Sequence, residues 1–243
     1  MARRTKRPPA EPEPTPAEAP EPEPAPAERR PRKGDATRRR IRDAAFALFA
    51  ERGYAATTMR DIAERAGCAL GLIYRYFKRR EELGLELFAM IADDGDALAD
   101  LIGRPLSAAF AEGLHRRIEA LAPHRDVLRA LASAALDRSS SLSLLGPETA
   151  PVRDKVIAGF QAIVDAAPDV RVDDRPLVAR AMFVAQLLVV LAWLQDPSPQ
   201  ARHTHALIDT LADTLLVLAP VMPMMMPTLE RYDRLLNAFI YGR

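Results

Sequence analysis

Residues 57–83 constrain the fold of this chain most strongly, because they predict two short helices joined by a tight turn. Thr57 or Thr58 can accept backbone N–H bonds at the start of the first helix. About one turn further in, Asp61 or Glu64 puts a negative charge where the helix dipole favours it and where a capping box can form. Apolar side chains recur at spacings of three and four and give this helix one buried face: Met59, Ile62, Ala63 and Ala66.

A glycine separates the two predicted helices. Gly67 can take the left-handed conformation that ends the first helix, and a second short helix is expected at about residues 69–77. Apolar side chains of the second helix must face a core, and they are Leu70, Ile73 and Phe77. The other side of the helix presents small residues and then hydrogen-bond donors: Ala69, Gly71, Tyr74 and Arg75. Because small residues let a helix approach the major groove of DNA closely, the pattern predicts a helix-turn-helix that lies on nucleic acid.

Another amphipathic helix is predicted before this motif, at residues 36–52. Its apolar stripe is formed by Ile41, Ala45, Leu48 and Phe49. Gly53 follows the last periodic residue and is expected to stop the helix. Residues 34–83 therefore predict a three-helix domain that presents its third helix outward.

The motifs of this domain resemble a known family. They are Ala-Phe-Ala-Leu-Phe-Ala-Glu-Arg-Gly-Tyr at 45–54, Thr-Thr-Met-Arg-Asp-Ile-Ala-Glu-Arg-Ala-Gly at 57–67, Gly-Leu-Ile-Tyr-Arg-Tyr-Phe at 71–77 and Arg-Glu-Glu-Leu at 80–83. In type and order they look like the DNA-binding domain of TetR-family repressors, over about a fifth of the chain. The resemblance implies an all-helical homodimer that binds a palindromic DNA operator, with a divergent C-terminal domain that senses a small molecule.

Position on the two helices suggests a role for each DNA-facing residue. Thr58, Tyr74, Lys78 and Arg80 are expected to fix the register on the phosphate backbone, whereas Leu70, Gly71 and Arg75 lie nearest to base edges. Ala69 departs from the family pattern, which often has Ser or Thr there, and Arg79 replaces a small polar cap. Arg80 occupies the place of the family's phosphate-contacting lysine. The full set of predicted DNA contacts is Thr58, Ala69, Leu70, Gly71, Tyr74, Arg75, Tyr76, Lys78 and Arg80.

Charge is distributed unevenly along the chain, although the net charge is only +1. Residues 34–83 hold eleven Lys and Arg against seven Asp and Glu, whereas residues 84–243 hold fifteen against twenty. The basic part coincides with the proposed DNA reader, and the acidic part is not expected to grip nucleic acid. An ordinary solvated surface is the alternative interpretation of the basic charges.

The N-terminal residues 1–33 differ in composition from the rest of the chain, because they hold ten of the 21 prolines, interleaved with Glu and Ala. Such a composition cannot form a core, so an extended, disordered tail is expected, and no apolar segment suggests a secretory signal. The tail either aids solubility or acts as an arm on phosphates or in the minor groove. The basic residues available to such an arm are Arg29, Arg30, Arg32 and Lys33.

Residues with reactive or metal-binding side chains are sparse. Cys68 is the single cysteine, which excludes an intrachain disulfide and favours a small, buried apolar role in a reducing cytoplasm. The histidines are read as surface or interface polar groups, and they are His115, His124, His203 and His205. No phosphate-binding glycine loop or nucleophile elbow is present. We therefore expect no enzyme activity, no metal and no cofactor.

The remainder of the chain also predicts helices, so the fold class is all-α. Residues 80–102 should form a connecting helix with Leu83, Leu87, Phe88 and Ile91 on one side, broken by the Gly-Arg-Pro sequence at 103–105. The other predicted helices are 105–121, 124–138, 151–167, 173–195, 199–219 and 228–241, with a serine-rich loop at 139–147. We assign residues 84–220 to an effector-binding and dimerisation domain.

The run 181–194 is apolar on nearly all sides. It is shorter than the about 20 residues that span a bilayer, so it is read as buried, with no membrane partner. The family resemblance implies that the helices at 173–195 and 199–219 form a four-helix interface with a second subunit. Burial within one subunit is the alternative.

Residues 221–243 form a C-terminal extension. Its methionines, Met222, Met224, Met225 and Met226, lie among three prolines and are read as loop packing, or else as an adaptable contact surface. The last helix carries an apolar stripe that must cover something: Leu229, Tyr232, Leu235, Leu236, Phe239 and Ile240.

We interpret the chain as a cytoplasmic, homodimeric, ligand-responsive repressor that binds a double-stranded DNA operator. Single polar residues within apolar helices are candidates for orienting a mostly apolar small-molecule effector of unknown identity: Gln161, Gln186 and Trp193. Satisfied core groups are the alternative interpretation of these three residues. Two other functions stay open, namely an architectural DNA-binding protein without an effector and an enzyme with an appended DNA-binding module.

Overall fold

The computed structural model describes residues 33–92 and 99–241, and within these ranges all regular structure is helical. The α-helices are α1 (Lys33–Arg52), α2 (Met59–Arg65), α3 (Leu70–Tyr76), α4 (Arg80–Ala92), α5 (Leu106–Leu121), α6 (Arg125–Leu136), α7 (Ala150–Ala166), α8 (Arg175–Gln195), α9 (Arg202–Leu218) and α10 (Met222–Tyr241). The all-α prediction is confirmed. Of the predicted disordered tail at 1–33, residues 1–32 lie outside the described residues, and Lys33 is instead the first residue of α1.

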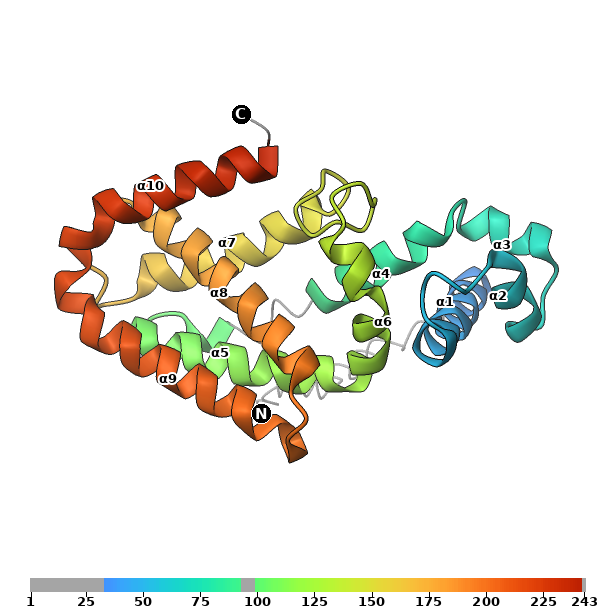
Figure 1. The fold of residues 1–243 in the computed structure, drawn as a ribbon, viewed down its shortest axis with the longest axis horizontal. Coiled ribbons are helices and arrows are strands. Elements are labelled where there is room, and N and C mark those ends of the chain that lie inside the picture. The colour runs from blue at the N-terminus through green and yellow to red at the C-terminus, as the bar shows by residue number, and fades with distance from the viewer. Residues whose placement is uncertain (1–32, 93–98, 242–243) are drawn as a thin grey trace, which may run out of the picture.

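The helices form two bodies joined by α4 (Figure 1). Helices α1–α3 lie at one end of the molecule, and α5–α10 make up the larger body at the other. Helix α6 also touches the small body, because α1 packs against it. Among the described elements, the larger body therefore meets the small domain through the chain in α4 and through the α6–α1 contact.

The small domain is built as the apolar periodicity predicts. Its core contains Ile41, Phe49, Ile62, Ile73 and Phe77, whose side chains are fully buried. These residues come from α1, α2, α3 and the residue that caps α3, so each helix contributes its predicted face. Cys68 is partly buried and packs against the same core.

Local capping explains where the two short helices begin and end. Thr58 is the N-cap of α2 and forms a capping box with Asp61, whose carboxylate accepts from the Thr58 backbone N–H at 2.8 Å. Thr57 is instead buried, and its hydroxyl donates to the Gly53 carbonyl at 2.9 Å. Gly67 has φ +61°, the left-handed conformation expected at the turn. The cap of α2 is thus Thr58 rather than Thr57.

The prediction of one connecting helix from 80 to 102 is wrong in its second half. Helix α4 ends at Ala92, and residues 99–101 form a separate 3-10 turn. Near the end of the described part of α4 the Arg117 guanidinium donates to the Ile91 carbonyl at 2.6 Å. Residues 93–98 lie outside the described ranges.

Helix α8 lies at the centre of the larger body. The length argument against a membrane span is wrong, because α8 has 21 residues with a mean hydropathy of 2.2 in its most apolar window. Half of that window is buried inside the fold, where α8 packs against α7 and also touches α5, α6, α9 and α10. Burial, rather than length, is the evidence that α8 is a core helix. The segment 199–235 passes the same length and hydropathy test with only 11% of its window buried.

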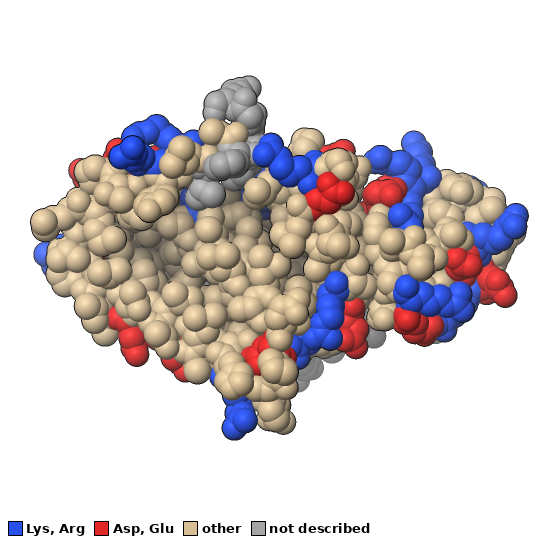
Figure 2. Space-filling view, in the orientation of Figure 1, with Lys and Arg blue, Asp and Glu red and all other residues tan. Residues whose placement is uncertain are grey.

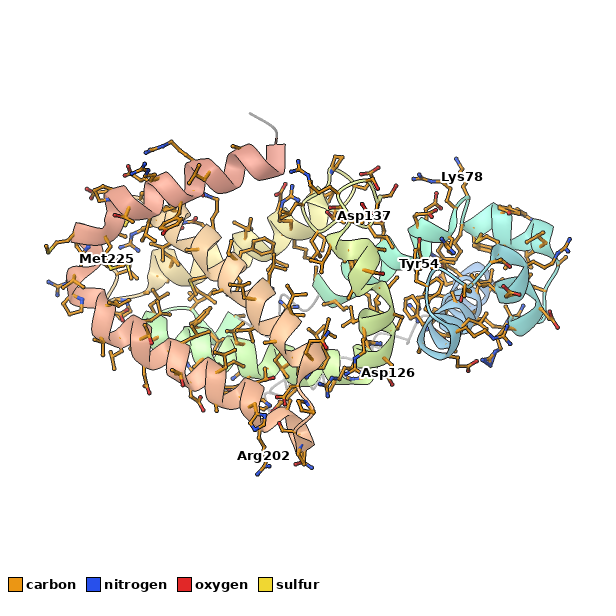
Figure 3. All side chains as sticks on the ribbon, viewed as in Figure 1. Tyr54, Lys78, Asp126, Asp137, Arg202 and Met225 are labelled. Atoms are coloured by element: carbon orange, nitrogen blue, oxygen red, sulfur yellow. The ribbon has the colours of Figure 1, made fainter. Side chains whose placement is uncertain are left out.

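The C-terminal extension differs from its prediction. Helix α10 begins at Met222, six residues before the predicted start, so the methionine cluster forms helical turns instead of a loop. A proline in the first turn of a helix costs little, because the N–H that it lacks has no intrahelical acceptor there. Pro223 occupies such a position, whereas Pro227 lies inside the helix. Met225 marks the end of α10 that is nearer to α9 in Figure 3.

Candidate DNA interface and effector cavity

The outward face of α3 consists of small and polar residues. Gly71 and Arg75 are exposed, and Tyr74 is 49% exposed. A Cβ at Gly71 would meet no atom within 4 Å, so internal packing does not require glycine there. The missing side chain leaves room for a close approach from outside the protein. Ala69, the N-cap of α3, is also exposed and makes no side-chain capping bond, as its departure from the family pattern implies.

Two predicted DNA contacts are partly occupied by packing. Leu70 and Tyr76 are half-buried and lie against the core of the small domain. Leu70 at the start of α3 nevertheless keeps an accessible part near Gly71. Tyr76 at the end of α3 belongs more to the domain's own packing.

The loop after α3 offers a cation in solvent. The Lys78 side chain is exposed and points away from the helices (Figure 3), while its backbone N–H donates to the Glu82 carboxylate at 2.9 Å. Thr58 is also exposed, and its hydroxyl lies 2.7 Å from the Asp61 carboxylate. The hydrogen bonds from Thr58 hold the pKa of Asp61 below its ordinary value, so this cap is charged at neutral pH.

Arg80 is turned into the protein. One guanidinium nitrogen, Nη1, donates to the carbonyls of Tyr54 at 2.9 Å, Ala55 at 3.2 Å and Thr57 at 2.7 Å. The guanidinium also lies 4.1 Å from the centre of the Tyr54 ring. These contacts tie the start of α4 to the segment that leads into α2. A phosphate would have to compete for a guanidinium that already holds three carbonyls.

Tyr54 completes this junction. Its hydroxyl donates to the Glu81 carboxylate at 3.1 Å, and its ring packs edge-on against Phe49 with centroids 5.1 Å apart. Burial raises the pKa of the Tyr54 hydroxyl, and the Glu81 charge adds to the effect. The tyrosine therefore stays neutral and holds α4 against the small domain.

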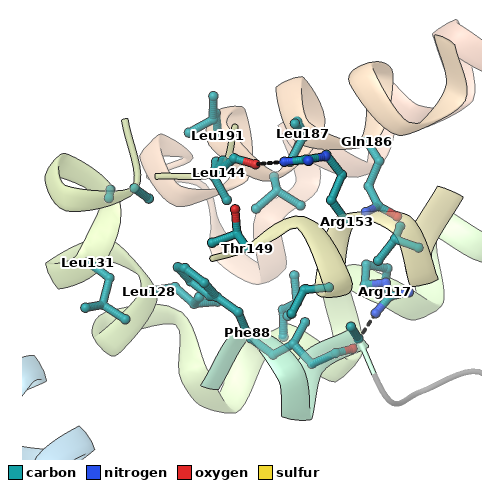
Figure 4. A pocket seen from close by; sticks show the side chains of 18 of the residues that line it. Phe88, Arg117, Leu128, Leu131, Leu144, Thr149, Arg153, Gln186, Leu187 and Leu191 are labelled. Atoms are coloured by element: carbon teal, nitrogen blue, oxygen red, sulfur yellow. Dashed lines mark hydrogen bonds between the residues drawn. The ribbon is translucent and has the colours of Figure 1, made fainter. Parts of the chain in front are cut away.

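An inner cavity of about 140 Å³ lies in the larger body (Figure 4). It is lined by α4, α5, α6, α7 and α8, and its wall is largely apolar. The polar side chains in the wall are Arg117, Thr149, Arg153 and Gln186, all of them buried. An apolar chamber with a few polar groups is typical of a small-molecule site.

Both arginines of the inner cavity are anchored on main-chain carbonyls (Figure 4). Arg117 is 8% exposed and holds Ile91, while Arg153 is 4% exposed and donates to Leu144 and Gly146, each at 3.2 Å. The two cations therefore shape the wall as well as charge it.

An outer cavity of about 470 Å³ adjoins the inner one between α7, α8 and α10. The two cavities have six lining residues in common: Ala135, Leu144, Arg153, Phe183, Leu187 and Leu191. The two cavities are thus neighbours that share part of their walls. Three charged residues occur only in the outer chamber, namely Arg138, Arg180 and Asp233.

The structure separates the three candidate ligand residues. Gln186 lines the inner cavity. Gln161 lies elsewhere on α7, lines neither cavity and donates to the Asp165 carboxylate at 2.8 Å. Trp193 is 2% exposed, lies 5.1 Å from the Arg125 guanidinium and is absent from the walls of both cavities. Trp193 is therefore a core residue outside both cavities, which favours the alternative interpretation for it.

The inner cavity touches the elements that reach the DNA-binding domain. Phe88, Ile91 and Ala92 come from α4, and residues of α6 form the neighbouring wall: Leu128, Leu131, Ala132 and Ala135. Because α4 continues into the small domain and α6 packs against α1, a change of the cavity's shape would act on both connections.

The histidines include a contact that the sequence did not reveal. His115 on α5 stacks on His205 on α9, with Nδ1 atoms 2.6 Å apart, and its Nε2 lies 2.9 Å from Asp209. This triad links two helices 90 residues apart in the chain. Among the described residues, no group of three or more His, Cys, Asp and Glu side chains could hold a metal ion.

Comparisons with known proteins agree with the helix-turn-helix. The family described as bacterial regulatory proteins, tetR family, matches residues 41–87. The chain is 38% identical over 85 residues to the uncharacterized HTH-type transcriptional regulator YhgD of Bacillus subtilis, covering 35% of this chain and 44% of that protein. It is 29% identical over 161 residues to the HTH-type transcriptional repressor KstR of Rhodococcus jostii, covering 65% and 72% respectively.

The likeness extends to the fold of the larger body. The transcriptional regulator FadR of Bacillus subtilis, solved in complex with stearoyl-CoA, has a TM-score of 0.56 at 21% identity, covering 74% of this chain and 96% of that one. The chain spans less than half the length of YhgD. Residues 41–87 thus match the TetR family of bacterial regulatory proteins, and the chain shares the helical fold of a solved TetR transcriptional regulator from Nitrosomonas europaea, with a TM-score of 0.55 at 22% identity over 73% of this chain and 96% of that one.

Proposed function

We propose that the protein is a dimeric transcriptional repressor that leaves its operator when an effector fills the cavity of the larger body. The observation that carries this proposal is the position of the inner cavity. Its walls include α4 and α6, which are the two connections to the DNA-binding domain. A ligand that changes the spacing of these helices would therefore change the placement of α3.

On DNA, the exposed face of α3 would read bases and the flanking residues would hold phosphates. Leu70, Gly71 and Arg75 lie where base edges would be met, and Lys78 is the exposed cation beside them. Thr58 and Tyr74 would add contacts to the backbone, with Ala69 close to the DNA. Since Arg80 already holds three carbonyls, its proposed role is to position the small domain on α4.

Dimerisation through α8 and α9 is supported by the surface of these helices. Figure 2 shows mostly uncharged side chains over α8 and α9, with the charged groups gathered towards the edges of this face. Leu188 on α8 is 63% exposed, and Val217 on α9 is 74% exposed. Two recognition helices would then meet successive major grooves about 34–36 Å apart, as a palindromic operator requires.

The effector class follows from the walls of the cavity. A long chamber of apolar residues suits a largely apolar ligand, and a protein of similar fold was solved with stearoyl-CoA. Binding that prefers the DNA-free arrangement would lower operator affinity by about 5- to 150-fold, which corresponds to about 1–3 kcal/mol of coupling.

The test is operator selection from random DNA, followed by affinity measurements with and without apolar compounds that raise the protein's melting temperature. Selection of a palindrome and weaker binding with a compound support the proposal. Binding without sequence preference would favour an architectural DNA-binding protein. Turnover of a bound compound would favour an enzyme with an appended DNA-binding module.

A further inference from the structure

The charges that line the two cavities are strongly unbalanced. Among the described lining residues there are four arginines, Arg117, Arg138, Arg153 and Arg180, against one acid, Asp233. Otherwise the walls are nearly all apolar. An amphipathic anion would match both the apolar walls and the excess of positive charge, whereas a neutral apolar ligand would match the walls alone.

Arg180 and Asp233 form a two-pronged ion pair at the outer chamber. The Arg180 Nε donates to Asp233 Oδ1 at 2.7 Å, and its Nη2 donates to Oδ2 at 2.9 Å. This fork geometry is the one in which guanidinium binds any carboxylate most strongly. The pair joins α8 to α10 across 53 residues of sequence, and the side chains are 36% and 16% exposed.

Helix α10 is seated shallowly on the rest of the protein. Among the side chains of α10 whose burial the structure describes, the least exposed are Met222, Met225, Met226, Leu229 and Asp233, and none of them is fully buried. On its outer side Met224 and Tyr232 are strongly exposed. Figure 1 shows α10 lying along the outside of the larger body, and Figure 2 shows the surface hollowed beneath it. The ion pair with Arg180 is therefore one of the described contacts that join α10 to α8.

We propose that the effector is an amphipathic carboxylate whose acid group replaces Asp233 on Arg180, so that binding releases α10 from the mouth of the cavity. This inference rests on the proposed function and deepens it by naming the ligand's charge and the residue that reads it. The ligand's apolar chain runs from the outer chamber, past Arg153, towards α4.

The exchange is balanced in charge and hydrogen bonds. One carboxylate leaves the guanidinium fork and another enters it, so Arg180 keeps its partner while Asp233 moves into water. Burial of the ligand's chain in the apolar walls supplies the driving force. Asp233 competes well because it is tethered, and a tethered group acts at a high effective concentration. Arg117 and Arg153 are worse receptors, because they hold main-chain carbonyls of the wall itself.

The experiment compares three ligands with the same ten-carbon chain: decanoate, decan-1-ol and decylamine, each titrated calorimetrically into the full-length protein. Wild type should bind decanoate best. Asp233→Asn removes the internal competitor and should tighten decanoate severalfold while leaving decan-1-ol within about twofold. Glu230→Gln is the matched control, because it makes the same change one turn away at a residue outside the cavity wall. It should alter neither affinity.

Exchange of the two charges gives the sharpest test. The Arg180→Asp/Asp233→Arg variant restores an ion pair and should reverse the preference, so that decylamine binds better than decanoate. If this variant does not fold, Arg180→Gln replaces it and should abolish the preference for decanoate over decan-1-ol. Release of α10 is read by trypsin cleavage after Arg231 and Arg234, which decanoate should accelerate in wild type and decan-1-ol should not.

Equal binding of decanoate and decan-1-ol, or no binding of any of the three, would overturn the inference. An unchanged preference after charge exchange would also overturn it, because a purely structural ion pair predicts that result. A different result would contradict the proposed function. Decanoate that binds by this exchange without changing operator affinity leaves the exchange standing and removes the coupling to DNA.

Discussion

Replacing Gly84 with alanine should destabilise the protein, although alanine is the better helix former. Gly84 lies inside α4, and a Cβ there would come within 2.8 and 2.9 Å of the two methyl carbons of Leu142. Carbon atoms pack best at about 3.5–4.0 Å, so the overlap is close to 1 Å. Leu142 is fully buried and cannot swing into solvent. The close approach explains why the connecting helix carries a glycine against the serine-rich loop.

The sign of the change in the free energy of unfolding on Gly84→Ala depends on the magnitudes of two opposing effects. Overpacking of a well-filled site costs about 1–3 kcal/mol, whereas replacing glycine by alanine inside a helix gains about 1 kcal/mol. We therefore expect a net loss of about 1 kcal/mol for Gly84→Ala. In the background of Leu142→Ala, which itself costs about 2–5 kcal/mol, the overlap is gone and Gly84→Ala should become stabilising.

Denaturant unfolding of the four proteins in this cycle measures both values. The reversal of sign is the decisive feature, since helix propensity alone predicts stabilisation in both backgrounds. If Gly84→Ala stabilises the otherwise native protein, then α4 and the loop are not packed as tightly as the structure has them, and the reasoning fails.

Further consequences concern DNA, assembly and pH. Lys78→Ala should weaken binding to all DNA sequences alike and reduce the slope of log affinity against log salt by about 0.9 for each Lys78, or about 1.8 for the dimer; an unchanged slope would remove Lys78 from the phosphate contacts. Arg80→Lys should lower the melting temperature along with operator affinity, because lysine cannot keep all three carbonyl contacts that Nη1 of Arg80 makes; a loss of affinity at unchanged stability would restore Arg80 as a direct phosphate ligand. Leu188→Asp should shift sedimentation from dimer to monomer, and a stable wild-type monomer at micromolar concentration would contradict the dimer. Hydrogen bonds, first from the Ser198 hydroxyl, hold the pKa of Asp196 below its ordinary value of 3.8. The contribution of the Asp196 carboxylate to the free energy of unfolding is therefore complete above that pH and is lost on acidification. Asp196→Asn should accordingly flatten the fall of melting temperature below about pH 4.

The small domain could be predicted from the sequence because its signals are local. The cap at Thr58, the left-handed Gly67 and the apolar spacing of α1–α3 each act within a few residues, and the structure has all of them. The same locality explains the helices of the larger body, whose ends fall within a few residues of their predicted positions up to α9. The start of α10 was missed because prolines signal a break wherever they stand, although the first turn of a helix tolerates them.

The sequence by itself thus determined the fold class, the helix-turn-helix and the outward residues of α3. Only the tertiary structure decided which polar residues face the cavity, because Gln161, Gln186 and Trp193 look alike as single polar groups in apolar helices. It also decided that Arg80 turns inward and that Arg180 meets Asp233, a pairing 53 residues apart. The physical reason is the same in each case. Backbone periodicity and caps are fixed by neighbours along the chain, whereas the partner of a long side chain depends on how separate helices pack in space.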